Sequence, residues 1–202
     1  MYLSKVLING TACRNPYEIH RVLWKLFPED ADAERDFLFR VERSGQQSVE
    51  VLMLSRREPA TAVTREVRLM GSKPYILSLQ QDQRLRFMLV ANPVKTINDE
   101  GARLNSANKI KKCRVPLIHE EDLRAWLKRK LEGVAVIEEV EVEKRPAMNF
   151  RKTREKRVGK VQAVSFHGVL SVTDSVELIS LINTGIGPAK AFGCGLLSLA
   201  RT

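Results

Sequence analysis

Apolar residues recur at helical spacing near the start of the chain. Asn15 stands where a helix N-cap is expected, and Pro16 occupies the first helical position, which proline tolerates. The pattern therefore predicts a helix that begins at residue 16 and ends at Phe27-Pro28. The apolar face of this helix consists of Ile19, Val22, Leu23 and Leu26.

Short apolar and β-branched runs predict strands in the rest of the first half. The strands are expected over 2–8, 36–43, 49–54 and 75–80. The second and third of them form a hairpin that Ser44-Gly45 closes. Residues 59–70 are rich in Thr and Val and give no assignable element.

In the second half, segments with the helical spacing of apolar residues alternate more clearly with segments typical of strands. Its predicted order, from residue 112 onward, is β-α-β-β-α-β, the ferredoxin-like unit. The first half shows β-α-β-β with a weaker end, so we expect an α+β protein of two tandem ferredoxin-like (βαββαβ) domains with antiparallel sheets, over residues 1–82 and 83–202. The elements expected in the second half are strands 85–91, 113–118, 134–143, 160–172 and 195–199 and helices 120–132 and 175–183.

Composition narrows the class of protein. The chain has 202 residues, of which 44% are hydrophobic and 29% charged, proportions that allow a buried core. No apolar stretch reaches the ~18–20 residues of a membrane span. Three cysteines, an odd number without a CxxC pair, argue against a disulfide scaffold or a cysteine metal site. We expect a cytoplasmic protein with no signal peptide and no membrane partner.

Charge is concentrated in two segments. The net charge of +10 resolves into +5 over residues 103–114, +7 over residues 144–160 and −2 over the remaining 173 residues. Two patches on a nearly neutral body favour binding of a polyanion, nucleic acid first, over a pair of solvated loops. The candidate RNA-binding residues are Arg103, Lys109, Lys111, Lys112 and Arg114 in the first segment and Arg151, Lys152, Arg154, Lys156 and Arg157 in the second.

Only three histidines are available for acid–base chemistry. His20 shares a helix flank with Tyr17 and Trp24, where an imidazole could transfer protons near neutral pH or simply pack on Trp24. His119 is expected at a helix entry and His167 in a half-buried strand. No histidine or carboxylate spacing builds a metal site, so we expect neither a metal nor another cofactor.

The densest glycine feature is GIGPAKAFGCG, residues 185–195. It follows a helix and precedes a strand, the reverse of a dinucleotide-binding loop, and it lacks the GK[ST] of a phosphate-binding loop. Either a tight turn or close approach to a phosphate chain, with a lysine at its centre, remains open. The candidate residues are Gly185, Gly187, Lys190, Gly193 and Gly195. Lys160, beside the second basic segment, could stabilise a phosphorane-like charge or contact a phosphate.

Several segments together resemble one family. They are MYLSKV (1–6), DFLFRVE (36–42), ANPVKTI (91–97), KCRVPLI (112–118) and FHGVLSVTD through GIGPAKAFGCGLLSLA (166–200). The chain is similar from end to end to CasE, the family of CRISPR repeat-processing endoribonucleases of the type I-E Cascade complex, within the RAMP superfamily.

The resemblance implies a fold and a reaction. It implies two ferredoxin-like domains, including a second helix in the first domain that the pattern does not reveal. It also implies metal-independent cleavage at the 3′ base of a repeat hairpin, which leaves a 2′,3′-cyclic phosphate and a 5′-hydroxyl. By the same resemblance His20 is the proton-transfer residue, Tyr17 positions the 2′-hydroxyl or phosphate, and Lys160 stabilises charge.

The partners expected from the resemblance are the CRISPR repeat RNA stem-loop, gripped by residues 151–157, and other protein subunits of Cascade. The main alternative is a non-catalytic subunit that binds structured RNA. A basic subunit that binds only proteins is a third possibility, and an RRM is disfavoured because no RNP1 pattern is present.

Overall fold

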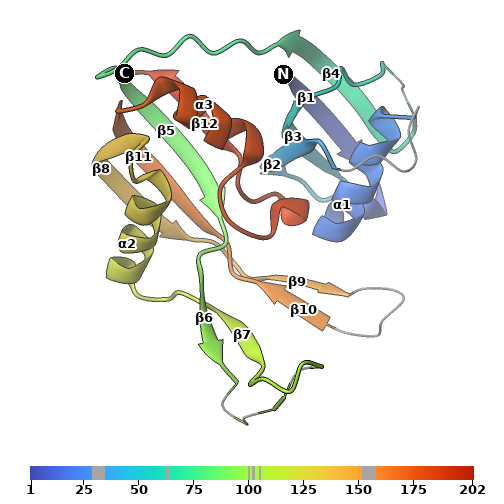
Figure 1. The fold of residues 1–202 in the computed structure, drawn as a ribbon. Coiled ribbons are helices and arrows are strands. Elements are labelled where there is room, and N and C mark those ends of the chain that lie inside the picture. The colour runs from blue at the N-terminus through green and yellow to red at the C-terminus, as the bar shows by residue number, and fades with distance from the viewer. Residues whose placement is uncertain (29–34, 62–63, 100, 102, 105, 152–157) are drawn as a thin grey trace.

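The computed structural model describes the whole chain except residues 29–34, 62–63, 100, 102, 105 and 152–157 (Figure 1). It contains two four-stranded antiparallel sheets and two two-stranded hairpins.

The N-terminal sheet has the strand order β2-β3-β1-β4. This is the ferredoxin-like order, because the first strand lies between the third and the fourth. Its elements are β1 (Tyr2–Asn9), α1 (Pro16–Leu23), β2 (Phe37–Ser44), β3 (Ser48–Ser55) and β4 (Val67–Pro74). Two short 3-10 helices flank α1, η1 (Thr11–Arg14) and η2 (Trp24–Leu26).

The predicted helix and hairpin of this half are confirmed, but the last strand was placed wrongly. β4 covers residues 67–74, whereas 75–80 form no strand. β4 pairs only with β1 and is mostly exposed, so its polar residues Arg68, Ser72 and Lys73 obscured its strand pattern. In the described residues between β3 and β4 there is no helix, so the second crossover helix that the resemblance implies is not seen there.

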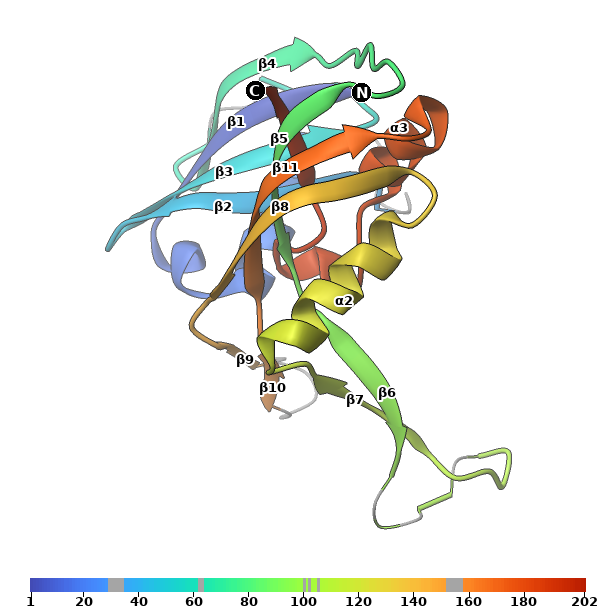
Figure 2. The same ribbon diagram turned by 90° about the vertical axis from the view of Figure 1, so that its left-hand side faces the viewer.

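The C-terminal sheet has the strand order β12-β5-β11-β8, again ferredoxin-like. Its helices α2 and α3 cover one face (Figure 2). The elements are β5 (Arg84–Ala91), α2 (Glu120–Leu131), β8 (Ala135–Lys144), β11 (Val164–Val172), α3 (Ser175–Thr184) and β12 (Leu197–Arg201). The α+β class with two ferredoxin-like sheets is therefore confirmed.

Two predictions for this half were wrong in detail. The first strand of the ferredoxin-like unit is β5, not 113–118, because β7 (Lys112–Pro116) pairs only with β6 (Val94–Asn98) in a separate hairpin. The predicted strand 160–172 is two strands, β10 (Val158–Val161) and β11, with a break at residues 162–163. β10 pairs with β9 (Met148–Arg151), so the described residues 148–151 and 158–160 of the second basic segment lie in a hairpin.

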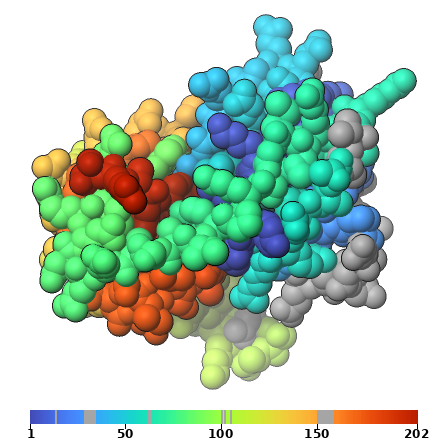
Figure 3. All heavy atoms as spheres, turned by 90° about the horizontal axis from the view of Figure 1, so that it is seen from above, coloured from blue at the N-terminus to red at the C-terminus, as the bar shows by residue number. Residues whose placement is uncertain are grey.

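One buried cluster contains residues of both sheets, beside a second cluster between the N-terminal sheet and α1. Leu38 and Leu54 of the N-terminal sheet belong to the same buried cluster as Leu89, Phe166 and Leu197 of the C-terminal sheet. Seen from above (Figure 3), the two halves lie side by side and the chain that joins them crosses their junction. The backbone N–H of Tyr75 donates to Met1, and that of Asp82 donates to Val172. A domain boundary between residues 82 and 83 stays a prediction.

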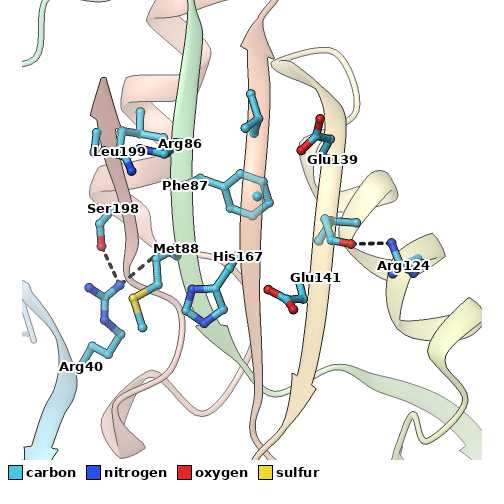
Figure 4. Close-up of a pocket in the computed structure, with 14 residues that line it drawn as sticks. Arg40, Arg86, Phe87, Met88, Arg124, Glu139, Glu141, His167, Ser198 and Leu199 are labelled. Atoms are coloured by element: carbon cyan, nitrogen blue, oxygen red, sulfur yellow. Dashed lines mark hydrogen bonds between the residues drawn. The ribbon is translucent and has the colours of Figure 1, made fainter. Parts of the chain in front are cut away.

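Arg40 ties the halves together (Figure 4). Its side chain is 4% exposed and leaves β2 to donate to the carbonyls of Met88 and Leu196, both at 3.3 Å, and to Ser198 Oγ at 2.5 Å. Its Nε also pairs with Glu42 at 2.7 Å. Because a buried guanidinium must satisfy its donors, these bonds fix β2 against β5 and β12.

Candidate active site

Helix α1 presents Tyr17 and His20 one turn apart. The Asn15 side chain caps the helix, as predicted, by accepting from the backbone N–H of Tyr17 at 3.0 Å. Residues three apart lie on the same helix flank, so both side chains face the same neighbourhood. Ile19, Val22 and Leu23 are buried against the N-terminal sheet, which holds the helix in place.

His20 lies in an aromatic pocket. Its ring is 5.5 Å from the ring of Phe37, 6.4 Å from that of Phe39, and edge-on to Trp24 at 6.3 Å between centroids. Its Nε2 is buried and, among the described residues, has no hydrogen-bond partner. The histidine thus packs on Trp24 and also keeps an unpaired nitrogen, so the packing interpretation does not displace the catalytic one.

The pocket controls the charge of His20. Burial, and secondly the positive charge of Arg35, lower the pKa of His20 from 6.5 to about 4. Both effects disfavour the imidazolium, so His20 is neutral at pH 7 and able to accept a proton.

The glycine-rich loop packs against α1. Its 3-10 helix η3 (Lys190–Phe192) contacts both α1 and β2 (Figure 1). Gly193 has φ +81°, and a Cβ there would lie 3.2 Å from the ring of Phe39, which itself stacks on His20. A Cβ at Gly195 would lie 2.9 Å from the Ile186 carbonyl oxygen.

All four glycines predicted for this loop have positive φ, and at each the missing side chain would meet protein atoms. These glycines therefore serve a tight, closely packed turn. The loop's polar contribution at the site comes from Lys190, whose Nζ donates to the Thr184 carbonyl at 2.5 Å. Burial, and secondly the charge of Arg35, lower the pKa of Lys190.

The β9–β10 hairpin is joined to this loop at its base. Met148 and Val161 pack with Ala189, Phe192 and Cys194 in a small apolar cluster. α1 also contacts β9, so helix, loop and hairpin meet at one place.

Lys160 stands on β10 in register with Asn149 of β9 and is exposed. The structure thus brings Tyr17, His20 and Lys190 together, with Lys160 on the adjoining hairpin. Arg151 ends β9, and its side chain lies outside the described residues, as do Lys152, Arg154, Lys156 and Arg157.

Sequence reasoning missed Arg35, whose charge acts on both His20 and Lys190. A signal was available, because Arg35, Phe37 and Phe39 alternate, and alternate residues of a strand share a face. Arg35 directly follows the acidic run that ends at Glu34, which hid it in a count of net charge.

The first basic segment forms the end of the β6–β7 hairpin, which projects from the body (Figure 2). Arg103 makes a bidentate ion pair with Asp99 at 2.6 and 2.9 Å, and its side chain is still 71% exposed, so RNA binding by Arg103 stays a prediction. Hydrogen bonds from Arg103 hold the pKa of Asp99 well below its usual range. The other four predicted residues of this segment are exposed, namely Lys109, Lys111, Lys112 and Arg114.

A separate hollow of about 700 Å³ lies on the sheet face that α2 and α3 do not cover (Figure 4). His167 stands there directly across the strands from Met88 and Glu141. Its lining mixes Arg86 and Arg124 with Glu139 and Glu141, so it shows no preference for an anion. His119 is the N-cap residue of α2, as predicted.

Among the described residues no group of three or more His, Cys, Asp or Glu side chains is arranged to hold a metal ion. Over the same part of the chain, no helix combines the length and apolar character needed to cross a membrane.

Taken together, the fold and the site define a two-sheet ferredoxin-like protein with a neutral histidine on the helix that contacts both a glycine-rich loop and the β9–β10 hairpin. The family described as "CRISPR associated protein" matches residues 1–201. The chain is 46% identical to CRISPR system Cascade subunit CasE of Escherichia coli K12, over 99% of both chains. It is 34% identical to CRISPR-associated endoribonuclease Cse3 of Thermus thermophilus, over 99% of this chain and 100% of that one. The chain belongs to this CRISPR-associated CasE/Cse3 family.

Solved structures agree with this assignment. The crystal structure of Cas6e from E. coli K-12 superposes with a TM-score of 0.85 at 43% identity, with both chains fully covered. A structure of CRISPR endoribonuclease Cse3 bound to a 19-nucleotide RNA superposes with a TM-score of 0.79 at 32% identity, again over both whole chains.

Proposed function

We propose that the chain is a metal-independent endoribonuclease that cleaves CRISPR precursor RNA at the base of the repeat stem-loop. The observation that carries the proposal is His20, a neutral imidazole with an unpaired nitrogen, held where α1, the glycine-rich loop and the β9–β10 hairpin meet. Relatives named as an endoribonuclease, one of them bound to RNA, support the same reaction.

The chemistry needs a proton acceptor and a cation. His20 takes the proton of the 2′-hydroxyl beside the scissile phosphate, and the 2′-oxygen attacks phosphorus. The bond from phosphorus to the 5′-oxygen breaks, and that oxygen takes a proton from solvent. The products carry a 2′,3′-cyclic phosphate and a 5′-hydroxyl. Tyr17 positions the 2′-hydroxyl or the phosphate, and Lys160 stabilises the charge that develops on the phosphoryl oxygens.

The RNA is held by the basic hairpins. RNA's deep major groove excludes side chains, so residues 151–157 contact phosphates or enter where the stem's end widens the groove. The exposed cations Lys111, Lys112 and Arg114 extend this surface along the β6–β7 hairpin.

The same proposal includes retention of the product and assembly into a Cascade complex with other protein subunits. A curated relative at 46% identity is named as a Cascade subunit, and E. coli Cascade bound to a DNA target contains a chain that superposes with a TM-score of 0.62 at 30% identity. The proposal also includes a cytoplasmic location. The three cysteines Cys13, Cys113 and Cys194 are free thiols, which is typical of proteins in a reducing compartment.

His20→Ala tests the catalytic assignment. We expect the single-turnover rate on labelled repeat hairpin to fall by at least ~10²-fold with little change in RNA affinity. His167→Ala is the matched control and should cleave normally. Cleavage by His20→Ala at the natural rate would reject the assignment.

Two further measurements define the reaction. Cleavage should persist in EDTA, and a strict need for a divalent metal would reject the mechanism. A shifted but uncut band with the natural protein would instead favour the non-catalytic RNA-binding subunit. Mass analysis of both new ends identifies the cyclic phosphate and the 5′-hydroxyl.

A further inference from the structure

Two cations flank His20 without a balancing carboxylate in the described part of the site. Arg35 lies two residues before Phe37 and four before Phe39, the rings against which His20 packs. The backbone N–H of Arg56 donates to the Asp36 carbonyl at 3.1 Å, so the residue that follows Arg35 is hydrogen-bonded to the segment after β3. Arg35 thus directly precedes the part of β2 whose rings pack on the histidine.

The second cation comes from the glycine-rich loop. Lys190 reaches the Thr184 carbonyl with Nζ, which leaves donors of the ammonium group uncommitted. The charge of Arg35 acts on both Lys190 and His20, so the guanidinium lies within electrostatic reach of both.

The described carboxylates closest in sequence to these groups are committed elsewhere. Asp36 accepts two bonds from Arg57, at 2.8 and 3.1 Å. Glu18, on α1, pairs with Arg21 at 3.3 Å. Like charges that no carboxylate of the described residues balances cost free energy, which an incoming anion recovers. The arrangement of Arg35, Lys190 and His20 is therefore that of an anion site.

We propose that Arg35 is a further catalytic residue, whose guanidinium binds the scissile phosphate beside His20. The inference rests on the proposed endoribonuclease function and adds a residue to it. A guanidinium presents two parallel donors to a phosphate, which fixes orientation as well as charge. Those donors would hold the phosphoryl oxygens as their negative charge grows in the transition state.

Arg35 would also couple RNA binding to the proton acceptor. In the free protein its charge opposes protonation of His20. Once a phosphate neutralises that charge, His20 accepts the proton of the 2′-hydroxyl more readily. The acceptor becomes more basic when the substrate is in place.

Arg35→Gln tests the proposal, with Arg68→Gln as the matched control. Both arginines are exposed, and Arg68 lies on the outer strand β4, so each variant removes one positive charge without opening the core. Thermal unfolding verifies that both variants fold. Cleavage is measured in single turnover at saturating protein, binding with a repeat RNA that carries a 2′-deoxy nucleotide at the cleavage position, and the pKa of His20 by NMR titration of the free protein.

Arg35→Gln should lower the saturating cleavage rate about 10²-fold, and Arg35→Lys should recover part of it. The pKa of His20 should move upward in Arg35→Gln and stay unchanged in Arg68→Gln. A natural saturating rate in Arg35→Gln overturns the proposal, whether or not its affinity for RNA is reduced. If His20→Ala also cleaves normally, the proposed function fails instead, so the two failures are distinguishable.

Discussion

The two basic hairpins leave the C-terminal sheet at the same end of its strands. Ala91 of β5, Val164 of β11 and Lys144 of β8 lie side by side in the sheet. The β6–β7 hairpin continues from β5, and the β9–β10 hairpin joins β8 to β11 (Figure 1). By charge alone they are similar, +5 against +7 in the sequence segments that contain them.

Their attachment differs. The β9–β10 hairpin has an apolar base, since Met148 and Val161 pack on the loop that contacts the helix of His20. The β6–β7 hairpin is braced internally by Asp99, Arg103 and Cys113, and it exposes Leu104 and Ile110 near its end. Two similar charge patches thus differ in their connection to the candidate active site, and that connection depends on a few apolar residues.

Acid should destabilise the His20 region before the β6–β7 hairpin. The folded pKa of His20 is about 4 against 6.5 unfolded, so the unfolded chain binds more protons between these values. The stability from this group is complete above pH 6.5 and is lost as pH falls toward 4, by up to about 3 kcal/mol. The pKa of Asp99 is also depressed, so the contribution of its ion pair persists until the pH is well below 4.

Urea unfolding at pH 7 and pH 4.5 checks this expectation. The natural chain should lose about 2–3 kcal/mol more than His20→Gln over that interval. His119→Gln, which removes an exposed histidine, should behave like the natural chain. Equal losses in the natural chain and His20→Gln would show that the burial of His20 has no energetic consequence.

Local sequence signals predicted most of the fold. The Asn15 cap and the apolar stripe of α1 were decisive. Helix 175–183 was also predicted, and in the structure the Asp174 side chain caps it by accepting from the backbone N–H groups of Val176 and Glu177 at 3.0 Å. The order of α2, β8, β11, α3 and β12 was predicted from the alternation of helical and strand patterns of apolar residues along the chain. The signal failed at β4, which is mostly exposed and pairs with a single neighbour. β7 was predicted as a strand, but it was assigned to the wrong sheet, since it pairs only with β6.

The candidate site was predictable only where its residues share an element. The spacing of Tyr17 and His20 predicted that they share a flank because both lie on α1, whereas their roles came from the family resemblance and stay predictions. Lys190 joins them through packing between residues about 170 positions apart, which no periodicity reveals. The ion pair of Arg103 with Asp99 was not predicted for the same kind of reason, since a count of basic residues does not show pairing. RNA binding by Arg103 stays a prediction.

Lys160→Ala against Lys112→Ala compares the hairpins directly. Each lysine is exposed and stands on the second strand of its hairpin. We expect Lys160→Ala to lower the saturating cleavage rate by roughly 10²-fold, because it removes a charge that stabilises the transition state. Lys112→Ala should leave that rate unchanged. Equal rates in the two variants would mean that the apolar base of β9–β10 gives its lysine no special role.

The smallest effect on chemistry is expected from the β6–β7 hairpin. Replacing Lys111, Lys112 and Arg114 by Gln should weaken RNA binding and flatten the dependence of log Kd on log salt by up to about 2–3 units, since each lost phosphate contact removes roughly 0.7–0.9. The cleavage rate at saturating protein should not change, because this hairpin holds RNA without joining the loop beside His20.

A charge-matched control distinguishes the loss of RNA contacts on the β6–β7 hairpin from a general loss of electrostatic attraction between protein and RNA. Replacing Arg56, Arg65 and Arg68 by Gln removes the same charge from exposed positions in the first half of the chain and should leave the salt slope nearly unchanged. If the saturating rate of the hairpin variant fell together with its affinity, the β6–β7 hairpin would be part of the catalytic arrangement. The apolar base of the β9–β10 hairpin would then not explain how the two hairpins differ in their effect on cleavage, and the path of the bound RNA across both hairpins would have to explain it.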